Sequence, residues 1–199
     1  MKKLVFFPWN AILASEAQKM TSWVNTGDYK TDHYTGAVLN TMKSRIVGEI
    51  YVFGHCSPGS LTISNDANQH LQYDDVADRI ETSGLPKVYS GAIKIFACES
   101  GTPSATMSFA KRFAKYFYFD KKYLLARVYG YERPLNSNMS TDQQTKLGQA
   151  GNWIANDSYF QKTHSKAHKW ATSDYWVNPG DVNAVKAKDA RSYFSPFGS

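Results

Sequence analysis

The chain contains few cysteines and no long hydrophobic run. Only Cys56 and Cys98 are present among its 199 residues, too few for the disulfide framework of a small secreted domain, so we expect synthesis in a reducing compartment. No stretch approaches the roughly 20 apolar residues of a membrane-spanning helix, and we expect no membrane span. The apolar run after Met1 stops at Pro8 and is too short for a signal peptide. The protein is therefore expected in the cytoplasm, or exported without a cleaved signal.

Several motifs that carry chemistry are also missing. The sequence has neither a Gly-x-Ser-x-Gly nucleophile elbow nor a glycine-rich phosphate-binding loop. His164 and His168 stand four residues apart, a spacing that can hold a metal on one face of a helix. No third ligand accompanies them, so we expect no metal and no other cofactor.

The remaining composition is that of one folded domain, with or without an appendage. Hydrophobic residues make up 42% of the chain and aromatic residues 15%, which is ample for a core. The formal net charge is +6, but Lys and Arg are scattered along the sequence. A solvated basic surface explains that pattern, and we do not expect a nucleic-acid partner.

Apolar runs alternate with amphipathic stretches along the first two thirds of the chain. Strands are predicted at 4–7, 49–55, 92–97 and 124–131, helices at 15–24, 38–46, 74–80 and 104–117, a polar loop at 25–32, and a short strand or hairpin at 61–63. This alternation predicts an α/β fold with a mainly parallel sheet and helices on both faces. We expect a core at 1–135 and a C-terminal extension at 136–199, packed on or near the core.

Two candidate catalytic residues directly follow predicted strands. His55 ends the strand at 49–55, and Cys98 follows the strand at 92–97. In open parallel sheets, ligands bind beyond the carboxyl ends of the strands, which meet at one edge. A thiolate attacks a carbonyl, and an adjacent imidazole takes the thiol proton. The sequence therefore predicts a Cys98–His55 dyad facing a shallow cleft at this edge.

The layout resembles the caspase clan, which includes caspases, legumains, gingipains, separases and the self-cleaving peptidase domains of bacterial toxins. The matching stretches are YVFGH at 51–55 and IKIFAC at 93–98, and their spacing is close to the roughly fifty residues of caspases. The resemblance implies a caspase-like three-layer sandwich and a metal-free endopeptidase. It assigns Cys98 as nucleophile and His55 as general acid/base, with backbone of Gly54 and Cys56 contributing to the site and its oxyanion hole.

The sequence departs from the clan pattern at three positions. Cys56 replaces the glycine that usually follows the histidine, and Phe96 and Ser100 replace a glutamine and a glycine of caspases proper. A distant bacterial member, an effector or toxin, fits better than a caspase. Cys56 has two interpretations: a reduced neighbour that lends its N–H to the oxyanion hole, or the partner of Cys98 in a reversible disulfide.

Glu99 and Asp66 are candidates for binding a basic residue of a protein or peptide substrate. As solvated loop carboxylates they would have no such role. The rival functional hypothesis is a non-catalytic effector or toxin domain that uses the same fold to bind a partner protein. The sequence does not predict the oligomeric state.

Overall fold

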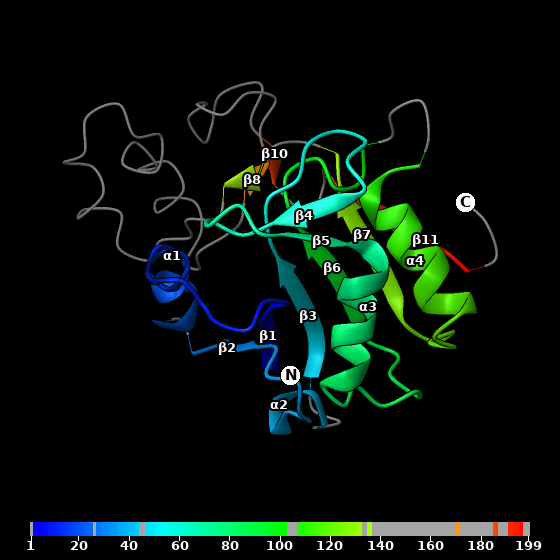
Figure 1. Cartoon of the computed structure of the whole chain (residues 1–199), viewed down its shortest axis with the longest axis horizontal. Coiled ribbons are helices and arrows are strands. Elements are labelled where there is room, and N and C mark those ends of the chain that lie inside the picture. Colours follow the sequence, from blue (N-terminus) through cyan, green and yellow to red (C-terminus); the bar gives the residue numbers. More distant parts are fainter. Residues whose placement is uncertain are drawn as a thin grey trace.

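A six-stranded mixed sheet lies at the centre of the computed structural model, which describes residues 2–25, 27–43, 47–102, 107–132, 135–136, 170–171, 185–186 and 191–196 (Figure 1). In spatial order its strands are β2 (Tyr29–His33), β1 (Lys2–Phe7), β3 (Val47–Phe53), β6 (Ala92–Phe96), β7 (Arg127–Tyr131) and β11 (Arg191–Phe194). Neighbouring strands run parallel, except that β11 is antiparallel to β7. The α/β fold with a mainly parallel sheet is therefore confirmed.

Four helices and two small sheets accompany the central sheet in the described part of the chain. The helices are α1 (Ala14–Asn25), α2 (Asn40–Lys43), α3 (Tyr73–Thr82) and α4 (Phe109–Phe119). The small sheets are the hairpin of β4 (Thr62–Ser64) with β5 (His70–Gln72), and the set of β8 (Leu135–Asn136), β9 (Trp170–Ala171) and β10 (Val185–Lys186). Within the described residues, every helix is too short or too polar to cross a lipid bilayer.

The side chains of β3 alternate between two buried clusters, one on each face of the sheet. Ile50 and Val52 join the larger cluster, to which α3 and α4 contribute most of the helical side chains. Tyr51 and Phe53 join the second cluster, which includes Met20 of α1. Because both faces of the sheet are covered, the sequence of β3 has a continuous apolar run at 50–53 rather than alternating apolar and polar residues.

The phenylalanine spacing in helix α4 correctly predicted which face of the helix is buried. Phe109, Phe113 and Phe117 stand four residues apart and are all buried, since this spacing places them on one face of a helix. Ser108 caps the helix, and its Oγ accepts a hydrogen bond from the Lys111 N–H at 3.3 Å. The helix therefore begins at Phe109 rather than at the predicted residue 104, which lies outside the described residues.

Strands β2 and β7 of the central sheet differ from the sequence prediction. The segment predicted as a polar loop contains β2, in which only Tyr29 is buried. It is an edge strand paired with β1 alone, so its polar side chains keep contact with water. Strand β7 begins at Arg127 and not at 124, because Leu124 and Leu125 lie exposed in the preceding turn.

The edge strand β11 belongs to the segment expected as a C-terminal extension, yet it completes the central sheet. Its register pairs Arg191 with Tyr131 and Phe194 with Val128. The Tyr118 hydroxyl of α4 donates to the Phe194 carbonyl at 2.7 Å, which fixes the strand to the helix layer. Most of 136–199, including His164 and His168, lies outside the described residues.

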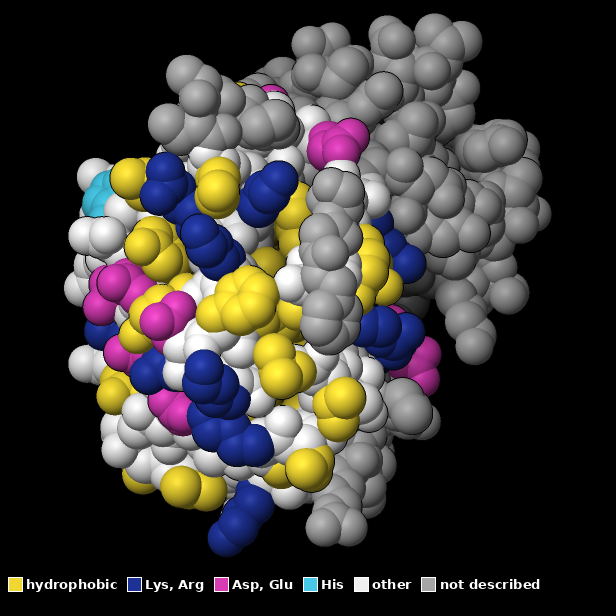
Figure 2. Space-filling model, turned by 90° about the vertical axis from the view of Figure 1, so that its right-hand side faces the viewer, with side chains coloured by type: hydrophobic (Ala, Val, Ile, Leu, Met, Phe, Trp, Pro, Cys, Tyr) yellow, Lys and Arg dark blue, Asp and Glu magenta, His cyan; other side chains and the backbone are white. Residues whose placement is uncertain are grey.

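The face on the α4 side carries basic side chains spread among apolar ones. Figure 2 shows Lys and Arg groups separated by hydrophobic and acidic side chains rather than gathered into one field. Lys111 and Lys115 of α4 are exposed on the side of the helix opposite its buried phenylalanines. On this face, the distribution is typical of a solvated surface.

Candidate active site

His55 and Cys98 occupy equivalent positions beyond two neighbouring parallel strands. The last paired residues of β3 and β6 are Phe53 and Phe96, and the candidate residues each follow two positions later. The Gly54 N–H donates to the Phe96 carbonyl at 3.3 Å, so the segments that follow β3 and β6 remain hydrogen-bonded just past the strand ends. Because adjacent strands lie about 4.8 Å apart, this register brings His55 and Cys98 to one edge of the sheet, as predicted.

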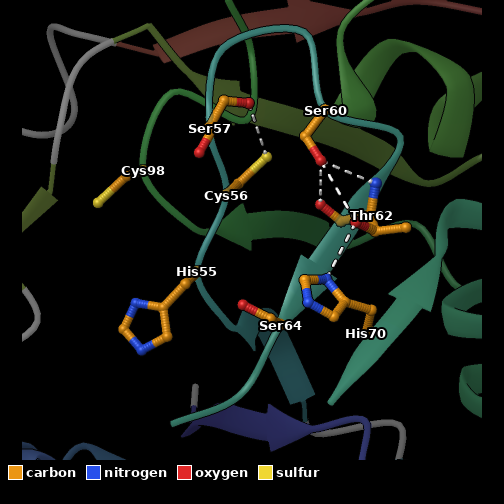
Figure 3. Close-up of a pocket in the computed structure, with 8 residues that line it drawn as sticks. All are labelled: His55, Cys56, Ser57, Ser60, Thr62, Ser64, His70 and Cys98. Atoms are coloured by element: carbon orange, nitrogen blue, oxygen red, sulfur yellow. Dashed lines mark hydrogen bonds between the residues drawn. The ribbon is translucent and has the colours of Figure 1, made fainter. Parts of the chain in front are cut away.

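The two candidate side chains also project in the same direction. Phe53 and Phe96 belong to the cluster on the α1 face. Alternation by two from Phe53 places His55 on that face, while Cys98 lies in the turn that follows β6. The rings of Phe53 and His55 are in edge contact, with centroids 6.1 Å apart. In Figure 3, His55 and Cys98 project to the same side of the backbone, while Cys56 projects to the other.

A polar pocket with a volume of about 190 Å³ opens beside these residues. Its lining consists of His55, Cys56, Ser57, Ser60, Thr62, Ser64, His70 and Cys98 (Figure 3). The β4–β5 hairpin supplies much of the wall, and the His55 N–H and C=O bond the Ser64 backbone at 2.8 and 2.9 Å. Neither His70 nor these hydroxyls were identified from the sequence as part of the site. The run of Ser and Thr directly after His55 was the available signal.

A fixed turn presents Cys98. Ser100 is fully buried, and its Oγ donates to the Ile95 carbonyl at 2.8 Å and accepts from the Tyr131 N–H at 3.2 Å. Glu99 has a φ of 52°, an uncommon conformation for a residue with a side chain and one that concentrates at functional sites. The turn is therefore held from both β6 and β7 while carrying a locally strained residue next to the candidate nucleophile.

Gly101 brings the turn after Cys98 close to strand β7. Its N–H donates to the Tyr131 carbonyl at 2.7 Å. A Cβ at this position would lie 2.9 Å from the carbonyl carbon of Gly130, a contact that backbone atoms cannot relieve easily. The turn after Cys98 therefore approaches β7 closely at residue 101, while residue 100 provides a hydroxyl for hydrogen bonding.

The two backbone groups assigned to the site have different surroundings. The Gly54 N–H is occupied by the Phe96 carbonyl, and a Cβ at residue 54 would lie 3.2 Å from both Ile63 Cδ1 and Trp9 Cη2. The absence of a side chain at Gly54 thus lets Ile63 and Trp9 pack closely against the backbone beside the site. The Cys56 N–H makes no hydrogen bond with another described residue, which leaves it available as a donor to a substrate oxygen.

The Cys56 thiol is poorly suited to act as a nucleophile, which must be exposed and readily deprotonated. Its Sγ donates to the Ser57 carbonyl at 3.4 Å, and it packs against the cluster on the α3–α4 face. Burial, with smaller contributions from Cys98 and Glu99, raises the pKa of this thiol to about 12. The two cysteines form no disulfide, and the opposite directions of their side chains in Figure 3 favour the interpretation of Cys56 as a reduced neighbour over a disulfide partner.

The structure places Asp66 against His55, in the loop between β4 and β5. Asp66 Oδ1 lies 2.6 Å from His55 Nε2, and both carboxylate oxygens lie 2.8 Å from Lys19 Nζ of α1. Asp66 is therefore already paired and does not line the pocket. Glu99 does not line it either and forms no ion pair with another described residue. Burial raises the pKa of the Glu99 carboxyl.

The pairing of Asp66 predicts a stability change at acid pH. Burial raises the pKa of this carboxyl, but hydrogen bonds from Lys19, Ser15 and His55 outweigh it and lower the pKa from 3.8 to about 2. A carboxyl whose pKa is lower in the folded than in the unfolded chain stabilises the fold at any pH above its unfolded-state pKa. This contribution to the free energy of unfolding is lost as the pH falls through the folded-state pKa. The stability advantage of wild type over Asp66→Asn should therefore be constant near neutral pH and shrink between pH 3.8 and about 2.

Urea unfolding of both proteins, followed by circular dichroism at a series of pH values, measures this difference. The exposed Asp78, which pairs with Lys121 far from the site, provides the control variant Asp78→Asn. A difference between wild type and Asp66→Asn that stays unchanged down to pH 2 would show that the folded carboxyl is not stabilised as an anion.

The described residues contain no group of three or more His, Cys, Asp or Glu side chains arranged to hold a metal. The site therefore offers a thiol, an imidazole, a carboxylate and several hydroxyls as its chemical groups. Comparison with known proteins gave no relatives: the sequence matches no family model and no curated protein, and the fold matches no solved structure.

Proposed function

We propose that this protein is a caspase-like cysteine endopeptidase with Cys98 as nucleophile and His55 as general acid/base. One observation carries the proposal: the two residues hold equivalent positions beyond the paired residues Phe53 and Phe96, and their side chains project to the same side of the backbone (Figure 3). Helices on both faces of the mainly parallel sheet support the three-layer architecture. The partial exposure of both side chains makes them accessible to a peptide.

The chemistry follows from the groups present. His55 Nε2 contacts Asp66, so Nδ1 is the nitrogen that takes the Cys98 thiol proton. The thiolate attacks the peptide carbonyl carbon, and the C–N bond breaks as His55 returns the proton to the leaving amine. Water then attacks the thioester with His55 as base, which releases the acid and restores the thiol. The Cys56 N–H is one donor suited to the developing oxyanion.

Selective alkylation tests the proposal before any substrate is known. At pH 7, a thiol with a pKa of about 12 has a thiolate fraction of only about 10⁻⁵. Iodoacetamide should therefore modify Cys98 at least about 100-fold faster than Cys56, because a neighbouring imidazole favours the thiolate. Peptide mapping by mass spectrometry after short exposures measures both rates.

Two controls make this experiment decisive. Unfolding in urea should bring the two labelling rates to within about threefold of each other, because both thiols then have ordinary pKa values. His55→Ala should slow the labelling of Cys98 and leave that of Cys56 unchanged. Equally slow labelling of both cysteines in the folded protein would favour the rival function, a domain that binds a partner protein without catalysis.

A further inference from the structure

The contact between His55 and Asp66 constrains where the imidazole carries its proton. An ionised carboxylate can only accept hydrogen bonds, so the contact of 2.6 Å between Asp66 Oδ1 and His55 Nε2 places a hydrogen on Nε2. In the neutral ring the other nitrogen, Nδ1, is then an acceptor. In Figure 3, Nδ1 lies on the side of the ring toward Cys98.

Helix α1 holds this carboxylate in place from the same face of the sheet. Lys19 Nζ lies 2.8 Å from both Asp66 oxygens, and the Ser15 side chain donates a further hydrogen bond. The Asp66 N–H donates to Glu16 Oε1 at 3.3 Å, while Glu16 Oε2 accepts from the Leu13 N–H at 3.0 Å. Side chain and backbone of Asp66 are thus both tied to one helix.

The loop around Asp66 is also fixed from within. Asn65 Oδ1 accepts hydrogen bonds from the Ala67 N–H at 3.1 Å and the Gln69 N–H at 2.8 Å. Asn65 is buried, whereas the Asp66 side chain retains 15% exposure beside a His55 side chain with 44%. The carboxylate is therefore built into a loop with its own hydrogen bonds, and it contacts an imidazole that is more exposed than the carboxylate itself.

We infer that Asp66 is a positioning residue: it holds His55 in the tautomer with the proton on Nε2, so that Nδ1 serves as the base toward Cys98. This inference deepens the proposed function and rests on it. It gives Asp66 a role in the reaction machinery in place of binding a basic substrate residue. It also assigns Lys19 and Ser15 of α1 as the groups that keep the carboxylate anionic and oriented.

The variant Asp66→Asn tests the inference with little change in shape. An asparagine has one acceptor oxygen instead of two, and Lys19 and Ser15 both donate to this position. The amide oxygen should therefore turn toward the α1 donors and its NH₂ toward His55. An NH₂ donor requires a bare Nε2, so the proton should move to Nδ1 and block the base.

The tautomer is read directly by ¹⁵N–¹H long-range NMR of the imidazole, at a pH where the ring is neutral. Wild type should show the proton on Nε2, Asp66→Asn should show it on Nδ1, and the control Asp78→Asn should match wild type. A wild-type ring protonated on Nδ1, or an unchanged tautomer in Asp66→Asn, overturns the inference. The wild-type spectrum alone decides the point if the variant does not fold.

Activity supplies the second readout. Relative to wild type, kcat/KM for peptide hydrolysis should fall by about 10³- to 10⁴-fold in Asp66→Asn, the scale found when the carboxylate of a Ser-His-Asp triad becomes an amide. Unchanged kcat/KM beside an active wild type overturns the inference. A tautomer change in a chain without any peptidase activity supports the positioning role and refutes the proposed reaction, so the two failures are distinguishable.

Discussion

Cys98→Ala should reduce peptide hydrolysis by about 10⁴- to 10⁶-fold, as the loss of a catalytic nucleophile does in other hydrolases. The fold should survive, because alanine is smaller than the partly buried cysteine and the turn is held by hydrogen bonds of Ser100 and Gly101. The two proteins, purified identically, are compared on a mixed-peptide substrate pool, and their unfolding is followed by circular dichroism.

The control for this variant is Ser90→Ala, another small substitution, at an exposed residue in the turn before β6. That turn lies at the opposite end of the strand from Cys98, so activity and unfolding should both match wild type. Full activity in purified Cys98→Ala would exclude Cys98 as the nucleophile. Loss of activity together with loss of the folded baseline would instead assign the residue a structural role.

Phe113→Ala should destabilise the fold by about 3–5 kcal/mol, the range for truncating a buried phenylalanine. Phe113 is fully buried on the inner face of α4, and its ring stacks on that of Phe117 with centroids 5.1 Å apart. The Phe117 ring stacks in turn on Tyr123 at 4.2 Å, so the cavity would open at the end of an aromatic stack. Urea unfolding of the variant measures the change in free energy.

The same helix offers a matched control. Phe119 has the same side chain as Phe113 but is 48% exposed, so Phe119→Ala should change the free energy of unfolding by no more than about 1 kcal/mol. Equal effects of the two substitutions would contradict the burial of α4 described above. The pair therefore compares the loss of a buried with the loss of an exposed phenylalanine ring in the same helix.

The features predicted from sequence are those that depend on local pattern. The apolar runs within β1, β3 and β6 were recognisable because strands covered on both faces are largely apolar, although each of the three also carries at least one charged residue. The joint placement of His55 and Cys98 required only that these strands be parallel and adjacent, since their carboxyl ends then coincide. This much of the candidate site follows from the order of elements along the chain.

The features that were missed depend on tertiary contacts. Strand β2 carries polar residues such as Lys30 because β1 is its only neighbour among the described strands of the sheet, so it resembles a loop in sequence. Asp66 was predicted only as a substrate-binding carboxylate or a solvated loop carboxylate, because its partners Lys19 and Ser15 come from α1, far away in the chain. Nothing in the local pattern around residue 66 indicates that a helix side chain will meet it beside an imidazole.

The pairing of β11 with β7 has a consequence for synthesis of the chain. Strand β7 leaves the ribosome well before residues 191–194 do, and until then its outer edge presents unpaired backbone N–H and C=O groups. An open edge of this kind can recruit a strand from another molecule. Contacts between segments so distant in sequence also form slowly. The nascent chain should therefore be most prone to aggregation between the emergence of Tyr131 and that of Phe194, a period in which a chaperone would matter most.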